Sequence, residues 1–469
     1  MGSKGSSLSG HRGLRRIGPR ALALLSTLSF AVPAIGSGPV HAARLVEWPL
    51  YGADLANSRT GSGGPTKAGA ASLVRAWSLD TTDGDFTGTP VVRDSRVFVG
   101  SNGGVVRALD VASGRVLWST VVDGPVNGSL AVAGKSVYVP VATVGDGAQK
   151  GPAVAALDEA TGQRRWETVI DTQKGSDTFG SPTVANGVVY IGVSAFFGEN
   201  NDSSVAVRGG VVALSADGGA IRWHTYTVSP GHDGGAVWST PAVDLGSRVL
   251  FVGTGNAYHE PADDNTDSIL KIRLQDGAIV QHVQATPSDA FSPGTPGPDV
   301  DFGASPNLMT APDGTGLVGA GQKSGFYWTF PRAHLVAGHE VWKSVIGTTG
   351  PTGGSVGSTA YDGTRIYGPN TLPGYIWALR AADGTQQWVH PGLDFLHYGP
   401  ASVSNGVVYT VDSAGFLDLI DAATGVPVAG PLSLGAAGFG GVALADGMVF
   451  TNTGTRSSNG SVIAFRPGP

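Results

Sequence analysis

The chain has 469 residues, of which 73 are glycine and only 14% are charged. This composition is typical of one large all-β body with many tight turns. The net charge is −6 and no basic block lies beyond the N-terminal region, so nucleic acid is not a predicted partner. The absence of cysteine excludes disulfides, thiolate metal sites, thiol nucleophiles and the C-x-x-C-H attachment of a c-type haem.

The N-terminal region, residues 1–42, has the pattern of an export signal. Four arginines precede an apolar stretch, Ala21–Ile35, and Val40-His41-Ala42 is typical of a cleavage site. The alternative is a membrane anchor, but prolines and a glycine interrupt the apolar run well short of the about 20 residues that a span needs. We therefore expect a secreted or extracytoplasmic mature chain with no membrane span. Arg15-Arg16 leaves both the Sec and the twin-arginine routes open.

One sequence pattern then recurs along the chain. A small-residue turn with proline precedes an alternating strand, a second strand that begins V-x-A-L-D, a T-G turn and a tryptophan. Its eight copies have second strands that begin at Val106, Val154, Val211, Ile269, Tyr327, Ile376, Leu417 and Val462. Since a single four-stranded sheet cannot cover its own apolar faces, we expect the units to stack around an axis. Residues 43–469 are thus predicted to form one eight-bladed β-propeller domain.

The two ends of the chain complete each other. The eighth copy stops at Ala464-Phe465-Arg466 without a tryptophan strand, whereas Leu73–Trp77 has no V-x-A-L-D strand before it. Pairing these strands would satisfy both exposed edges and close the ring. We therefore predict that N- and C-terminal strands share one blade.

The repeat A-L-D-x-x-T-G-x-x-x-W resembles the tryptophan-docking motif of quinoprotein dehydrogenases, which use pyrroloquinoline quinone (PQQ). Segments 234–244, 251–258, 298–303 and 318–325, with an N-terminal segment containing Trp48, Tyr51 and Asn57, are similar to the polyvinyl alcohol dehydrogenase branch of that family. Cofactor-free relatives share the docking motif, so the motif indicates fold better than function. The repeat tryptophans themselves are expected to pack between blades.

The resemblance implies a quinone site in the middle of the chain. Trp238 would lie under the quinone, and Lys323 would hold the quinone oxygens. Thr178 and Ser194 align with residues that bind the carboxylates of the cofactor. From the residues alone, Trp238 could instead pack a blade and Lys323 could be an ordinary surface lysine.

The resemblance also implies a calcium ion bound by Asn256, Glu199 and Asp301, oxygen donors that a hard divalent ion prefers. Asp301, rather than Asp299, would be the general base that takes the alcohol proton. On composition alone, Asn256 could be a turn residue and Asp301 a solvated loop acid.

Two departures from the family pattern bear on function. Ser204-Val205 stands where relatives have an adjacent cysteine pair, and no haem-binding segment is found. The sequence therefore predicts PQQ and calcium without haem, and electrons that leave to an external acceptor.

Two functions follow as hypotheses. The first is a PQQ- and calcium-dependent dehydrogenase of alcohols, with polyvinyl alcohol or secondary alcohols as substrates. The alternative is a non-catalytic propeller that serves as a binding or assembly scaffold. A hydrolase has less support, because no nucleophile elbow or zinc-ligand pair is present.

Overall fold

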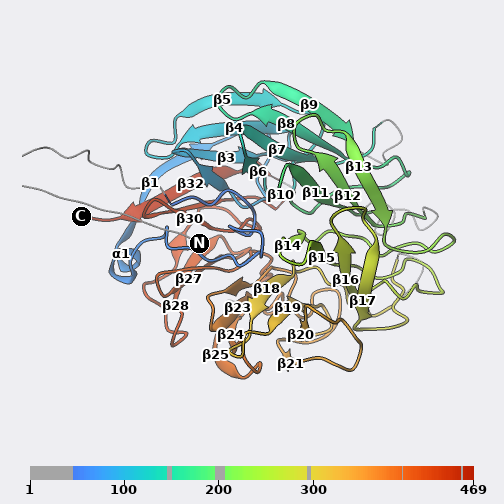
Figure 1. Ribbon diagram of the computed structural model, residues 1–469. Coiled ribbons are helices and arrows are strands. Elements are labelled where there is room, and N and C mark those ends of the chain that lie inside the picture. Colours follow the sequence, from blue (N-terminus) through green and yellow to red (C-terminus); the bar gives the residue numbers. More distant parts are fainter. Residues whose placement is uncertain (1–45, 145–149, 196–205, 293–296, 393–394, 456–457) are drawn as a thin grey trace, which may run out of the picture. The chain divides into compact units, whose positions relative to one another are not determined.

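The computed structural model describes residues 46–144, 150–195, 206–292, 297–392, 395–455 and 458–469. The predicted export signal lies outside the described residues. Leu45–Pro469 forms one compact unit, built almost entirely of β-strands (Figure 1). Among the described residues the one helix is α1 (Lys67–Ala71), and no helix is long and apolar enough to cross a membrane.

Eight four-stranded antiparallel sheets make up this unit, which confirms the predicted eight-bladed propeller. Blade 1 contains β2 (Val91–Arg93), β3 (Arg96–Gly100), β4 (Val105–Asp110) and β5 (Val116–Val121), and blade 2 contains β6 (Ala131–Ala133), β7 (Ser136–Val141), β8 (Ala153–Asp158) and β9 (Arg164–Val169). Blade 3 contains β10 (Thr183–Ala185), β11 (Val188–Val193), β12 (Gly210–Ser215) and β13 (Ile221–Tyr226), and blade 4 contains β14 (Ala242–Asp244), β15 (Val249–Gly253), β16 (Ser268–Arg273) and β17 (Ile279–Gln284). Blade 5 contains β18 (Asn307–Thr310), β19 (Gly316–Gly321), β20 (Phe326–Pro331) and β21 (Trp342–Val345), and blade 6 contains β22 (Ala360–Tyr361), β23 (Arg365–Pro369), β24 (Ile376–Arg380) and β25 (Gln386–His390). Blade 7 contains β26 (Ser402–Ser404), β27 (Val407–Val411), β28 (Phe416–Asp421) and β29 (Leu432–Ser433), and blade 8 contains β30 (Ala443–Ala445), β31 (Met448–Asn452), β32 (Ser461–Pro467) and β1 (Leu73–Asp80).

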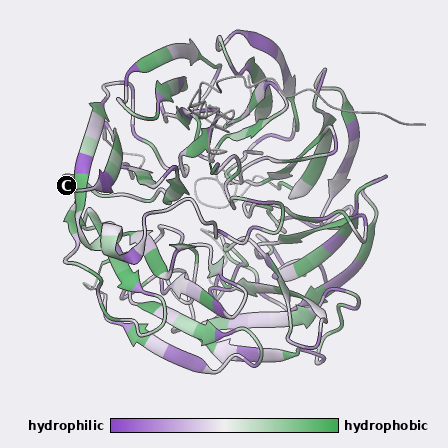
Figure 2. Cartoon of the chain, turned by 60° about the vertical axis from the view of Figure 1, so that its left-hand side comes forward, coloured by the Kyte–Doolittle hydropathy of each residue, from purple (hydrophilic) through white to green (hydrophobic). Residues whose placement is uncertain are grey.

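The ring closes as the sequence predicts. β1 pairs with β32 over Leu73–Asp80 and Ser461–Pro467, so the blue N-terminal strand lies beside the red C-terminal strand (Figure 1). The first strand of every blade contacts the first strand of the next, and β30 contacts β2 to complete the circle. Figure 2 shows hydrophobic and hydrophilic residues alternating along the strands. The inner strands β7 and β11 are nevertheless buried at every position, because both faces of a blade pack against neighbouring blades.

Tryptophans of the fourth strands join neighbouring blades. The indole N–H of Trp77 donates to the carbonyl of Val111 at 2.9 Å, across the closing blade boundary. The Trp77 ring lies on Gly114, where an added Cβ would stand 2.6 Å from the indole. Gly114 also has a φ of 69°, in the region that favours glycine. The T-G turn and the tryptophan of the repeat therefore form one interlocking contact between blades.

An N-terminal crossing segment, residues 48–64, contacts almost every blade. Its backbone carbonyls accept hydrogen bonds from the first strands of blades 2, 4, 5, 6 and 7, and Trp48 pairs with Val92 of blade 1. Arg59, fully buried, donates to the carbonyls of Tyr51 and Ala401. The segment hydrogen-bonds to the first strands close to their turns into the second strands. It therefore lies toward the end of the propeller axis at which these turns emerge.

Candidate functional site

The loops on one face of the propeller carry the predicted site residues. Because adjacent strands run antiparallel, the connections from second to third strand and from each blade to the next emerge on the same face. Trp238 and Asp301 lie on connections between blades, and Asn256 and Lys323 lie on connections between second and third strands. These four residues are spread over 85 positions of the sequence, from Trp238 to Lys323, and the structure brings them together on blades 3 to 5.

A cavity of about 590 Å³ lies at the axis, and all eight blades contribute to its wall. Trp238, Asp301, Lys323 and Ser194 line it, and Tyr51 of the crossing segment reaches it as well. The remaining wall is mostly small residues that precede the first strands, with four larger side chains: Phe179, Val356, Tyr398 and Phe439. A cavity of this size suits a planar tricyclic cofactor together with a small substrate.

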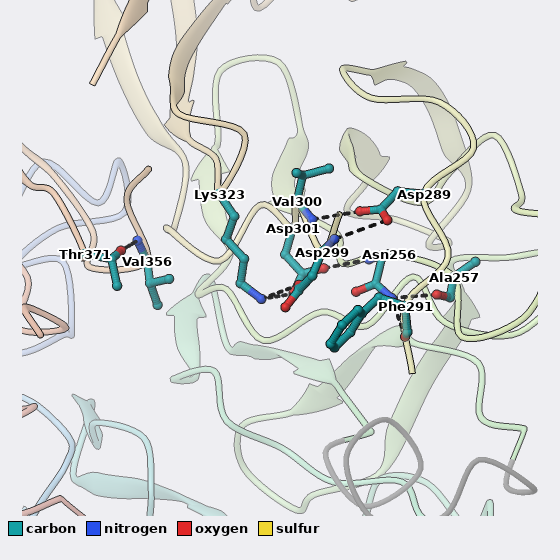
Figure 3. Close-up of polar contacts among 10 residues, drawn as sticks. All are labelled: Asn256, Ala257, Asp289, Phe291, Asp299, Val300, Asp301, Lys323, Val356 and Thr371. Carbon is teal, nitrogen blue, oxygen red and sulfur yellow. Dashed lines mark hydrogen bonds and ion pairs between the residues drawn. The ribbon is translucent and has the colours of Figure 1, made fainter. Parts of the chain in front are cut away.

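Lys323 is the centre of the charges in this cavity. Its ammonium donates to Asp299 at 2.6 Å and to Asp301 at 2.9 Å, and it lies 5.4 Å from the centre of the Trp238 ring. The lysine is only 7% exposed, so it is not an ordinary surface residue. Burial, and then repulsion by Asp301, raise the pKa of Asp299 to about 6. Both carboxylates therefore form an ion pair with the same lysine, Lys323 (Figure 3).

Asn256 is buried next to Asp301 and leaves one oxygen available. Its backbone N–H donates to Asp301 at 2.7 Å, and its side-chain amide nitrogen donates to the carbonyls of Ala257 at 2.5 Å and Phe291 at 2.9 Å. Two carbonyl partners fix which end of the carboxamide is nitrogen. The carbonyl oxygen of Asn256 then has no hydrogen-bond partner among the described residues. A buried orphan oxygen of this kind is a natural ligand for a cation.

The remaining predicted residues are placed less uniformly. Ser194 lines the cavity, and its buried hydroxyl has no partner among the described residues. The hydroxyl of Thr178 instead donates to the carbonyl of Gly192 at 3.0 Å, and Thr178 does not line the cavity, although Phe179 does. Glu199 lies outside the described residues.

These observations can be compared with the groups that the resemblance implies. The Trp238 ring, the Lys323 ammonium and the unpartnered Ser194 hydroxyl fit a planar, anionic quinone. The Asn256 oxygen and the Asp301 carboxylate fit a calcium ion. Within the described ranges, no three carboxylate or imidazole groups gather closely enough to hold a metal ion, so this pair supplies only part of a coordination shell.

Sequence reasoning missed several residues of the site. The pattern gave no signal for Asp289, which hydrogen-bonds the backbone before Asp301, or for the T-shaped pair of Tyr398 and Phe439, with ring centres 4.9 Å apart. A signal did exist for the channel wall. The small-residue turn with proline of each repeat, as in Ser181-Pro182 and Thr240-Pro241, is the part of the repeat that faces the axis.

The chain resembles known proteins in sequence and in fold. A family model described as outer membrane protein assembly factor BamB matches residues 69–284. A polyvinylalcohol dehydrogenase from a Pseudomonas species is 28% identical over 397 residues, covering 75% of this chain and 60% of that protein. The quinohemoprotein alcohol dehydrogenase ADH IIB of Pseudomonas putida is 29% identical, covering 52% of this chain and 40% of that protein. The crystal structure of quinohemoprotein alcohol dehydrogenase from Comamonas testosteroni superposes with a TM-score of 0.73 at 20% identity, covering 91% of this chain and 81% of that one.

These relatives correct one prediction. The sequence led us to expect a haem-free system, but the Pseudomonas putida and Comamonas testosteroni proteins are quinohemoproteins by name. The absence of cysteine excludes only the C-x-x-C-H attachment within this chain. It does not describe the whole system, since the chain spans 60% or less of the length of the curated relatives named here. The prediction of no haem was therefore wrong.

The PQQ prediction agrees with the same relatives, and the docking tryptophans account for the shared fold in physical terms. The repeat motif and the superposed structure agree on the fold. The chain therefore has the propeller fold of the quinohemoprotein alcohol dehydrogenase structure, and it is similar in sequence to polyvinylalcohol dehydrogenase at 28% identity.

Proposed function

We propose that this protein is an extracytoplasmic dehydrogenase that oxidises alcohols with PQQ and calcium, and that polyvinyl alcohol or smaller secondary alcohols are its substrates. The observation that carries the proposal is the joint placement of Trp238, Asp301 and Lys323 on one wall of the axial cavity. The names of the relatives support the substrate class, and the N-terminal sequence supports the location.

Each residue has a defined task in this proposal. Trp238 would support the planar face of the quinone, and Lys323 and Ser194 would bind its oxygens. Asn256 and Asp301 would ligate calcium from one side. When bound, the quinone supplies a two-electron hydride acceptor that no side chain offers.

Asp301 is the residue of this chain that would take the alcohol proton. Its carboxylate already accepts hydrogen bonds from the Asn256 backbone and from Lys323, so it is held in one orientation. A carboxylate has about four acceptor positions, which leaves room for the hydroxyl of an alcohol. Lys323 would stabilise the charged form of Asp301 before the proton transfer, and would stabilise negative charge on the acceptor after it.

The alternative function is a non-catalytic propeller that acts as a binding or assembly scaffold. The family model named after an assembly factor favours it, as does the absence of the cysteine pair. The two functions differ in what they require of Lys323 and Asp301. A scaffold has no need to bury a lysine with two carboxylates on the wall of the channel.

One experiment distinguishes the dehydrogenase from the scaffold. The mature protein is titrated with PQQ and calcium chloride, and dye reduction is then followed on addition of secondary alcohols or polyvinyl alcohol. Saturable quinone binding with alcohol-dependent dye reduction supports the dehydrogenase. Absence of quinone binding at every calcium concentration would refute it and favour the scaffold.

A further inference from the structure

The segment Asp289–Phe291 lies between β17 and β18 and contacts both loops that carry the proposed calcium ligands. Asp289 is fully buried, and it does not line the cavity. One of its oxygens accepts the backbone N–H of Asp299 at 3.3 Å, and the other accepts that of Val300 at 2.7 Å. A single carboxylate therefore holds two successive amides immediately before Asp301 (Figure 3).

The backbone at Asp299 needs such support. Asp299 has a φ of 53°, in the left-handed region that costs energy for most residues other than glycine. The two amides held by Asp289 flank this conformation. Once it is fixed, both the Asp299 and Asp301 side chains reach the ammonium of Lys323.

The other end of the segment holds Asn256. The N–H of Ala257 donates to the carbonyl of Asp289 at 3.1 Å, and the N–H of Phe291 donates to the carbonyl of Ala257 at 2.8 Å. The carbonyl of Phe291 also accepts the side-chain amide of Asn256. This short parallel pairing fixes both the backbone next to Asn256 and the direction of its carboxamide.

We infer that Asp289–Phe291 is the positioning element of the site, with Asp289 as a positioning residue that sets Asp299 and Asp301 relative to the Asn256 oxygen. The placement of these residues follows from the hydrogen bonds of Asp289 to Asp299 and Val300 and from the pairing of Asp289–Phe291 with Ala257. Its consequence for cation binding rests on the proposed function. Metal sites depend on such outer hydrogen bonds, whose loss typically lowers affinity by about 10- to 100-fold.

Asp289→Asn tests the inference with little change in volume. An asparagine has one acceptor oxygen, so only one of the two amides keeps its partner, and the new NH₂ group faces the other N–H. Asp263→Asn is a matched control: Asp263 is 9% exposed and also accepts two backbone N–H groups, from Ser229 and Asn265, both at 3.0 Å. It holds no residue of the proposed site.

Two measurements are made on the full mature protein. Hydrogen exchange followed by mass spectrometry should show peptides covering residues 297–303 exchanging at least tenfold faster in Asp289→Asn than in wild type, and unchanged in Asp263→Asn. Tryptophan-sensitised terbium luminescence, with the metal alone and no quinone, should show at least tenfold weaker cation binding in Asp289→Asn, with far-UV circular dichroism unchanged.

The two hypotheses can fail separately. If wild type binds terbium and quinone but Asp289→Asn behaves like Asp263→Asn in both measurements, the positioning role is overturned and the proposed function stands. If wild type binds neither, the proposed function is lost, and hydrogen exchange alone decides whether Asp289 holds the loop. Equal exchange in the two variants would then overturn the inference.

Discussion

The ammonium of Lys323 lies 5.4 Å from the centre of the Trp238 ring. The same ammonium hydrogen-bonds the carboxylates of Asp299 and Asp301, which are 4% and 2% exposed. One cation therefore joins the aromatic wall of the cavity to its acidic wall. The four side chains are therefore coupled, and substitution of one should alter the environment of the others.

Lys323→Met should destabilise the fold and weaken quinone binding. Removing one partner of a buried ion pair leaves an uncompensated charge, at a cost of about 3–5 kcal/mol. Thermal unfolding at pH 8 and a PQQ titration measure the two effects. Lys135→Met, at an exposed lysine, is the control. Equal unfolding temperatures for the two variants would show that the buried cluster contributes no net stability.

Gly303→Ala should displace the indole of Trp238. A Cβ at Gly303 would stand 2.2 Å from a Trp238 ring carbon, far inside contact distance, and overpacking of this kind costs about 1–3 kcal/mol. We expect a shift in tryptophan fluorescence and at least tenfold weaker PQQ binding. Gly430→Ala is the control, because nothing lies within 4 Å of its added Cβ. Unchanged quinone affinity in Gly303→Ala would argue against Trp238 as the supporting face.

Trp77→Ala should loosen the closing blade. The variant loses the hydrogen bond to Val111 and the packing on Gly114, a loss of about 3 kcal/mol for a large aromatic side chain. Urea unfolding measures this change. Leu117→Ala, at a side chain 36% exposed on β5, should cost much less. A Trp77→Ala protein as stable as Leu117→Ala would mean that the β1–β32 ladder alone closes the ring.

Asp418→Asn should make stability less dependent on pH. Burial, followed by repulsion from Asp412, raises the pKa of Asp418 to about 7. The unfolded chain ionises this group near pH 4, so its contribution to stability is present below pH 4 and is lost as the pH rises through 7. The asparagine variant should therefore gain stability over wild type at pH 8, by about 4 kcal/mol. Unfolding temperatures from pH 4 to 9 test this; a constant difference between the two proteins would contradict it.

The fold could be predicted because its determinants are local and repeated. The T-G turn places a glycine under a tryptophan of the preceding blade, so each copy of the repeat specifies one strand pair and one blade contact. The closing blade was predictable for the same reason, since Leu73–Trp77 and Ala464–Arg466 are halves of one unit. Trp238 and Lys323 were found through motif resemblance, and the structure places both in the cavity wall.

The support of the site could not be predicted in this way. Asp289 acts through backbone N–H groups ten and eleven residues away, and backbone groups leave no mark in a sequence pattern. Choosing Asp301 over Asp299 also concealed that Lys323 binds both. Thr178 was aligned to the cofactor, but a shift of one position places Phe179 rather than Thr178 against the cavity.

The crossing segment, residues 48–64, sets the order in which the molecule can be completed. It is among the first described parts of the chain to be synthesised, yet the carbonyl of Arg59 is bonded by Val403 of blade 7 and the carbonyl of Gly63 by Gly447 of blade 8. These partners are made hundreds of residues later. The segment must therefore wait for nearly the whole chain before its backbone is satisfied, and loop closure over such separations makes assembly slow. Loss of the last blade, by truncation or proteolysis, would remove the hydrogen bond between Gly447 and Gly63 and would leave the early strand β1 without its partner β32.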